Sequence, residues 1–233
     1  MKEYKLLNLY LVAFVAILML SNIIAGKLIQ IGPIILTAAV FLFPLSYIFG
    51  DVLTEVYGYA RSRRIIWYGF GANILMSLIF LMAIVLPYPP FWKGQEAFKT
   101  VLGLVPRLVL ASLVGYWVGS FGNSWILARM KEWMLKWDPQ SKHLWMRTIA
   151  STIVGEGIDT ILFVFIAFIG SMPFVAVLTM IGWQWVMKVG VEVAFTPVTY
   201  LVIHATKKAE GMDVVGTETY SPFRWLVRDR KET

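Results

Sequence analysis

Long apolar segments recur along the whole chain, and they constrain its fold more than any other feature. A membrane-spanning helix needs about 20 mostly apolar residues to cross the hydrocarbon core. The chain has 233 residues, of which 58% are hydrophobic and 15% are charged. We expect six membrane-spanning helices, at residues 6–26, 34–57, 65–87, 101–127, 146–170 and 174–204. The sequence therefore predicts an all-α membrane protein with one six-helix transmembrane domain, residues 1–209, and a cytoplasmic C-terminal tail, residues 210–233.

The basic residues predict the orientation of these helices. Cytoplasmic loops of membrane proteins carry an excess of Lys and Arg. Most of the 21 basic residues precede the first expected helix, follow the second, lie between the fourth and fifth, or follow the sixth. With six crossings, all of these regions fall on one side of the membrane. We therefore expect both termini in the cytoplasm.

The residue types that the chain lacks narrow its function. It has no cysteine and two histidines, so it has little with which to build a disulfide or a zinc or iron site. Glycine-rich nucleotide-binding motifs and the nucleophile motif of hydrolases are also missing from the sequence. The net charge is +7, and the basic residues lie mostly beside the expected helices. This position favours membrane lipid over nucleic acid as a partner. We expect no enzyme activity and no cofactor.

Polar side chains inside the expected helices mark the candidate site, because a charge in the hydrocarbon region costs free energy. Spacings of three or four residues place them on common helical faces. These faces carry Tyr47, Asp51 and Glu55 in the second helix, Glu156 and Asp159 in the fifth, and Gln184, Lys188 and Glu192 in the sixth. Lys188 could simply pair with an acid, but the carboxylates outnumber this one deeply placed base. Their surplus predicts a polar interior that accepts hydrogen bonds from a ligand.

The chemistry of these side chains suggests the kind of ligand. Carboxylates suit a molecule with adjacent N–H donors, such as the edge of a guanine-like base. Tyr47 and Trp183 flank the polar faces and could stack on a flat ring, although packing and lipid contact are the commoner roles of such residues. Asn22, near the outer end of the first helix, is a weaker candidate. Gly115, Gly119 and Gly122 form a small-residue face typical of helix packing.

Four segments of the chain resemble the queuosine precursor transporters, a vitamin-uptake-like family of six-helix bacterial inner-membrane proteins. They are SNIIAGK at 21–27, FPLSYIFGDVLTEVYGYARSRRIIW at 43–67, STIVGEGIDTILF at 151–163 and WQWVMKVGVEVAFTPVTY at 183–200. The resemblance runs from about residue 8 to residue 206. It implies uptake of 7-deazaguanine bases, such as 7-cyano-7-deazaguanine or its aminomethyl relative, for queuosine synthesis in tRNA.

The resemblance also implies roles for individual residues and leaves several alternatives open. The residues that it places along the ligand path are Asp51, Glu156, Asp159, Gln184, Lys188 and Glu192, with Asn22 and Glu55 as weaker candidates. The family is similar in helix count to the substrate-binding subunits of energy-coupling-factor vitamin transporters, which need ATPase partners. Two alternatives to a self-sufficient transporter therefore stay open. One is a binding subunit that works only with a separate ATPase module, and the other is a proton or cation channel. A homodimer and proton coupling through one of the carboxylates also stay open.

Overall fold

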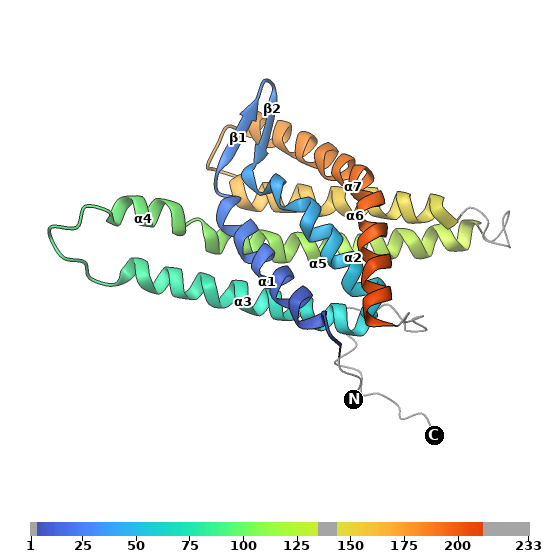
Figure 1. Ribbon diagram of the computed structural model, residues 1–233. Helices are drawn as coiled ribbons and strands as arrows, with labels where there is room; N and C mark the ends of the chain where they lie inside the picture. The colour runs from blue at the N-terminus through green and yellow to red at the C-terminus, as the bar shows by residue number, and fades with distance from the viewer. Residues whose placement is uncertain (1–3, 135–143, 212–233) are drawn as a thin grey trace.

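Helices form most of the chain, as shown by a computed structural model that describes residues 4–134 and 144–211 (Figure 1). A few side chains within these ranges, including that of Tyr47, are not described. The helices are α1 (Leu7–Ile24), α2 (Phe43–Tyr57), α3 (Tyr59–Val85), α4 (Gln95–Leu102), α5 (Val105–Met134), α6 (Leu144–Phe168) and α7 (Phe174–Glu210). A hairpin of strands β1 (Leu28–Ile31) and β2 (Ile34–Thr37) and a short 3₁₀ helix, η1 (Ala38–Phe41), connect α1 to α2.

The prediction of an all-α membrane protein is confirmed in its broad form. Among the described residues, four helices are long and apolar enough to cross a membrane: Leu7–Ile24, Arg61–Val85, Gln95–Asn123 and Phe174–Glu210. Because several such helices occur in one chain, the protein is a multi-pass membrane protein. The predicted tail from residue 212 onward lies outside the described residues, and Glu210 still belongs to α7.

The prediction of one continuous helix over residues 34–57 is wrong. Its first part forms β2 and η1, and α2 begins only at Phe43. Gly32 and Pro33 make a two-residue turn that pairs Ile31 with Ile34, and Gly32 has a positive φ of 58°, which glycine adopts without strain. The isoleucines on both sides of this turn favour strands. At about 1.5 Å per residue, α2 is therefore shorter than the hydrocarbon core is thick.

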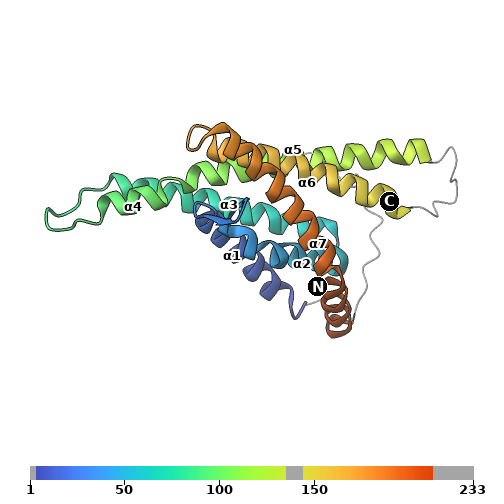
Figure 2. The ribbon, with the colours of Figure 1, turned by 90° about the horizontal axis from the view of Figure 1, so that it is seen from above.

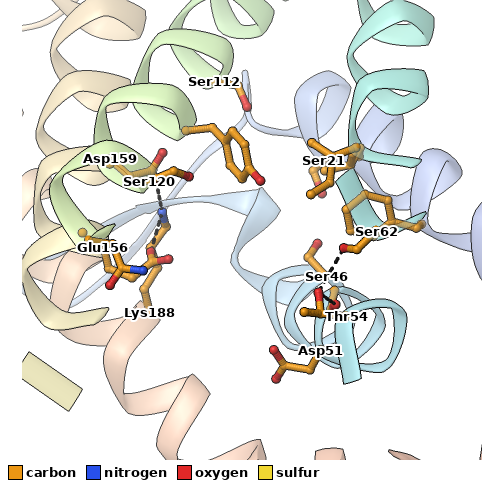
Figure 3. A pocket seen from close by; sticks show the side chains of 18 of the residues that line it. Ser21, Ser46, Asp51, Thr54, Ser62, Ser112, Ser120, Glu156, Asp159 and Lys188 are labelled. Atoms are coloured by element: carbon orange, nitrogen blue, oxygen red, sulfur yellow. Dashed lines mark hydrogen bonds and ion pairs between the residues drawn. The ribbon is translucent and has the colours of Figure 1, made fainter. Parts of the chain in front are cut away.

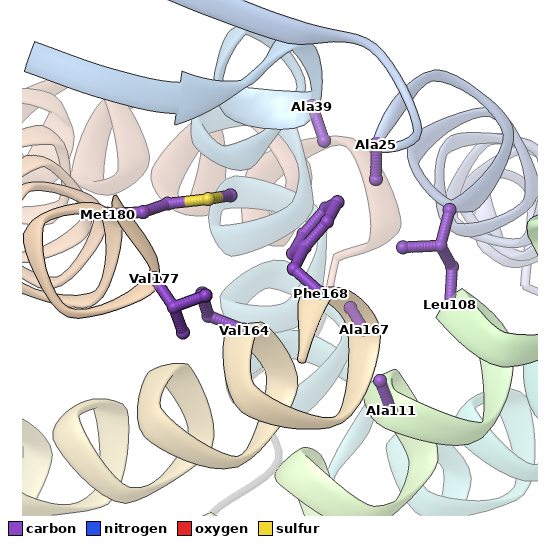
Figure 4. Close-up of a cluster of buried hydrophobic side chains, with 9 residues drawn as sticks. All are labelled: Ala25, Ala39, Leu108, Ala111, Val164, Ala167, Phe168, Val177 and Met180. Carbon is purple, nitrogen blue, oxygen red and sulfur yellow. The ribbon is translucent and has the colours of Figure 1, made fainter. Parts of the chain in front are cut away.

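The larger apolar cluster lies at the end of the molecule that carries the hairpin. Figure 4 shows Phe168 of α6 and Met180 of α7 extending toward Ala39 of η1, with Ala25 and Leu108 close by. All five residues are buried. A second cluster joins α1, α2 and the start of α3 near the N-terminal end of α1, where Tyr10, Phe14, Ile48, Val52, Leu53, Val56, Tyr57 and Ile65 are buried. The two clusters stabilise opposite ends of the bundle.

Small residues allow α5 and α6 to run side by side, as both views show (Figures 1 and 2). A Cβ added to Gly119 would lie 2.8 Å from the Gly155 carbonyl oxygen and 2.9 Å from the Asp159 Cβ. A Cβ added to Gly115 would lie 2.8 Å from the Asp159 Oδ1. The small-residue face of α5 is therefore occupied by α6, so it is not free for a contact between two copies of the chain.

Replacing Gly119 with Ala should push α5 and α6 apart and lower the stability by about 1–3 kcal/mol, the usual cost of overpacking. The measurement is the thermal unfolding midpoint of the purified protein in detergent. Gly182→Ala is the matched control, because a Cβ added to that helical glycine meets no atom within 4 Å. Equal midpoints for the two variants would contradict the described packing.

Glu210, the last residue of α7, holds three segments of the chain together. Its carboxylate accepts hydrogen bonds from the backbone N–H groups of Lys5, at 3.1 Å, and Leu6, at 2.7 Å. It also accepts a hydrogen bond of 2.9 Å from the hydroxyl of Tyr57, the last residue of α2. The start of the described chain, the end of α2 and the end of α7 are thus joined at one carboxylate.

Glu210→Gln should lower the unfolding midpoint by a few degrees, because a neutral amide offers one acceptor oxygen where the carboxylate offers two. Loss of one charge-assisted hydrogen bond in this partly exposed position should cost about 1 kcal/mol, or about 2–4 °C for a chain of this size. Lys208→Gln, which alters an exposed side chain on the same turn, serves as the control. An unchanged midpoint for Glu210→Gln would show that the three contacts add nothing to stability.

Candidate functional site

A polar cavity of about 410 Å³ lies between two groups of helices (Figure 3). Helices α1, α2 and α3 form one wall, and α5, α6 and one residue of α7 form the other. Its polar lining residues are Ser21, Asn22, Ser46, Asp51, Thr54, Ser62, Ser112, Tyr116, Ser120, Asn123, Thr152, Glu156, Asp159 and Lys188. In a bundle of apolar helices, such a concentration of hydroxyl, amide and charged groups is suited to a polar solute.

An ionic cluster occupies the wall formed by α6 and α7. The Lys188 ammonium donates a hydrogen bond to Oδ2 of Asp159 and lies 3.2 Å from Oε2 of Glu156 (Figure 3). The three-residue spacing of the two acids places both on the face of α6 that meets α7. The Lys188 side chain is 9% exposed and those of the acids are 22% exposed. Burial of this kind requires the charges to compensate one another, and in the described contacts one ammonium faces two carboxylates.

Hydroxyl groups line the opposite wall, and several are already hydrogen-bonded to their own helix. Thr54 donates to the Gly50 carbonyl oxygen at 2.9 Å and lies 3.0 Å from the Ser62 hydroxyl. Ser46 donates to the Leu42 carbonyl oxygen at 3.2 Å. These bonds fix the hydroxyl oxygens at the cavity wall while occupying their protons.

Asn22 belongs to a buried network that joins α1 to α3. Its amide nitrogen donates to the Asn73 side-chain oxygen at 3.0 Å and to the Leu18 carbonyl oxygen at 3.1 Å. The Asn73 amide in turn donates to the Gly69 carbonyl oxygen at 2.8 Å. Asn22 therefore combines a structural role between two helices with a place in the cavity lining.

Several buried polar atoms at or near the cavity have no hydrogen-bond partner in the described part of the chain. The Ser21 hydroxyl and the Asn123 side-chain oxygen are two of them, and both residues line the cavity. Gln184 is 1% exposed, and neither atom of its amide has a partner. Buried polar groups are normally satisfied, so these atoms point to a bound solute or water that completes their bonding.

The structure brings together five of the predicted site residues and places the others elsewhere. Those that line the cavity are Asn22, Asp51, Glu156, Asp159 and Lys188. Gln184 is buried one turn from Lys188 toward the apolar cluster, while Glu192 lies one turn to the other side and does not line the cavity. Glu55 is exposed and Trp183 is half-buried, and neither lines the cavity. The side chain of Tyr47 lies outside the described side chains.

The hydroxyl and aromatic side chains of the lining were not among the predicted site residues. On α2, a stripe beside the acids consists of residues spaced four apart: Ser46, Gly50 and Thr54. Ser112, Tyr116 and Ser120 form a similar stripe on α5 beside its glycines, with Asn123 on the next turn. Four-residue periodicity was the available signal, but single hydroxyl groups are common in membrane helices and are less conspicuous than charges.

A metal centre is not suggested by the arrangement of possible ligands. Among residues 4–134 and 144–211, no group of three or more His, Asp or Glu side chains is placed to hold a metal ion. Two acids of the cavity, Glu156 and Asp159, contact the Lys188 ammonium.

Apolar membrane-spanning helices around a polar cavity are typical of a multi-pass membrane transporter for a small solute. Comparison with known proteins leads to the same class, because residues 37–202 match the family described as "Putative vitamin uptake transporter". That match covers well over half of the chain and includes the cavity-lining parts of α2, α3, α5, α6 and α7. The protein is a transporter and not an enzyme.

Two curated relatives specify the family further. The chain is 27% identical over 182 residues to the "Probable queuosine precursor transporter" of Bacillus subtilis (strain 168), covering 77% of each chain. It is 30% identical over 132 residues to the "Queuosine precursor transporter" of Escherichia coli (strain K12), covering 57% of this chain and 55% of that one. No solved structure matches the chain. The chain belongs to the queuosine precursor transporter family, as its sequence predicted.

Lys188→Met should destabilise the protein by about 3 kcal/mol, because it leaves the Glu156 and Asp159 carboxylates without their ammonium partner. Further replacement by Glu156→Gln and Asp159→Asn should restore most of the lost stability, since the buried charges are then gone. Unfolding midpoints in detergent measure both effects. If the triple variant is no more stable than Lys188→Met alone, compensation of charge is not what this lysine contributes.

Proposed function

We propose that this protein imports queuosine precursors across the bacterial inner membrane for the synthesis of queuosine in tRNA. The substrates are 7-deazaguanine bases, such as 7-cyano-7-deazaguanine and 7-aminomethyl-7-deazaguanine. The observation that carries the proposal is the presence of carboxylates in the lining of the polar cavity. Two relatives of the chain are named as queuosine precursor transporters. Carboxylates are acceptors, and a guanine-like edge presents adjacent N–H donors.

The dimensions and lining of the cavity suit a flat heterocycle. A volume of about 410 Å³ falls within the range of small-molecule sites. Phe14, Phe70 and Tyr116 line it, and the last two rings pack edge to face with centroids 5.2 Å apart. These rings, in place of the predicted Trp183, would contact the faces of the base. The Lys188 ammonium offers a donor to a ring carbonyl oxygen beside the two acids.

We further propose that six segments cross the membrane with both termini in the cytoplasm. On this arrangement the β1–β2 hairpin faces the periplasm, and the apolar cluster of Ala39, Phe168 and Met180 lies between it and the cavity. The charged residues of α6 and α7 lie two to three turns from that cluster, toward the ends of the helices that face the cytoplasm. An apolar layer of this kind would oppose passage of a polar base, and on this proposal it closes the periplasmic side of the cavity. Transport requires the layer to open, and one of the cavity carboxylates would carry a coupling proton.

Uptake of labelled 7-cyano-7-deazaguanine into cells that cannot synthesise it tests the proposal. Cells that produce this protein should accumulate the base, and Glu156→Gln and Asp159→Asn should each reduce uptake at least about tenfold, because each removes a charge-assisted acceptor. Glu96→Gln, an exposed carboxylate in α4, is the control and should leave uptake unchanged at equal membrane expression. Absence of uptake of both 7-deazaguanine bases by a well-expressed original protein would refute the proposed substrate class.

Reconstitution separates this transporter from a subunit that depends on an ATPase module. Purified protein in liposomes should admit the labelled base without any other chain, and an inward proton gradient should drive its accumulation. Movement of the base only when an ATPase module is added would favour the dependent subunit. Ion conductance in the absence of any base would favour a proton or cation channel.

A further inference from the structure

Asp51 differs from the other acids of the cavity because it has no partner of opposite charge among the described residues. Its carboxylate lines the cavity on α2, across from the cluster of Lys188, Glu156 and Asp159. In Figure 3 it points away from Thr54 toward the side of the cavity that holds Lys188. Glu156 and Asp159 both contact that ammonium, whereas Asp51 receives no hydrogen bond or ion pair within residues 4–134 and 144–211.

The hydroxyl groups near Asp51 do not supply the missing partner. Thr54 donates its proton to the Gly50 carbonyl oxygen, and Ser46 donates to the Leu42 carbonyl oxygen. The nearest acid on the same helix, Glu55, repels Asp51 and does not compensate it. The Asp51 carboxylate therefore keeps its full capacity to accept hydrogen bonds from a solute in the cavity.

The cavity as a whole is short of positive charge. Its described lining contains three carboxylates and one ammonium. Two further lining atoms, the Ser21 hydroxyl oxygen and the Asn123 side-chain oxygen, are buried and have no hydrogen-bond partner in the described part of the chain. A solute that brings a positive charge and several N–H donors would complement this lining better than a neutral solute of the same shape.

We propose that Asp51 is a specificity-determining residue that binds a primary ammonium group carried by the transported base. The inference rests on the proposed function and narrows its preferred substrates to bases that carry a positive charge. The heterocycle lies against the Lys188 cluster and the aromatic rings, and its cationic substituent extends across the cavity to α2. A primary alkyl amine is protonated at neutral pH, as the lysine side chain is, so 7-aminomethyl-7-deazaguanine carries this charge and 7-cyano-7-deazaguanine does not.

The test compares concentration-dependent uptake of these two bases by the original protein, Asp51→Asn and Asp51→Glu at matched membrane expression. The original protein should take up the aminomethyl base with a KM at least about tenfold lower than that for the cyano base. Asp51→Asn should raise the KM for the aminomethyl base about tenfold or more and change the KM for the cyano base less than about threefold. Asp51→Glu, which keeps the charge, should retain the preference. Glu96→Gln, an exposed carboxylate on α4 that does not line the cavity, is the control and should leave both values unchanged.

Three outcomes would overturn the inference. They are an original protein that does not prefer the aminomethyl base, an Asp51→Asn variant that loses both bases equally, and one that loses neither. In each of these cases the original protein still imports a deazaguanine, so the proposed function survives. Failure of the original protein to import either base would overturn the proposed function together with this inference.

Discussion

The contact of Lys188 with Glu156 and Asp159 is the interaction on which the rest of the structure depends. Charges in an apolar bundle persist only when they compensate one another, and this cluster connects the middle of α6 to the middle of α7. The surrounding packing is arranged to hold α6 in place. Glycines of α5 let it approach closely, and Arg107 of α5 donates hydrogen bonds of 2.7 and 2.5 Å to the carbonyl oxygens of Ile166 and Ile169 at the end of α6.

The cavity follows from what this cluster leaves uncompensated. In the described lining one ammonium faces two carboxylates, and Asp51 on the opposite wall is a third. The apolar cluster at the hairpin end and the hydrogen bonds of Glu210 at the other end stabilise the bundle on either side of this polar centre. A polar solute that supplies donors and positive charge would complete the bonding of the cavity, which connects the electrostatics of the fold with transport.

Much of this arrangement could be predicted from the sequence, and the part that could not has a physical cause. Apolar segment length located the long helices, and helical spacing placed Glu156 and Asp159 on one face. The same spacing joined Glu55 to Asp51, but only Asp51 lines the cavity. Periodicity orients a helix about its own axis without identifying its neighbours, so Trp183 was predicted at the site while Phe70 and Tyr116 were not. The helix predicted from residue 34 began later because a Gly-Pro turn between isoleucine-rich runs formed a hairpin, a local signal that apolarity alone did not reveal.

The central claim is that the base binds beside the Lys188 cluster. Its most direct test is whether the bound base protects a thiol in the cavity from chemical modification. The natural chain has no cysteine, so Ser120→Cys introduces one thiol into the cavity lining without further changes. The rate at which a small hydrophilic maleimide modifies this thiol in membranes should fall several-fold when 7-aminomethyl-7-deazaguanine is present. Modification of Lys99→Cys, an exposed position on α4, should not change. Unchanged modification of Ser120→Cys at a base concentration that saturates its transport would contradict the account and place the base elsewhere.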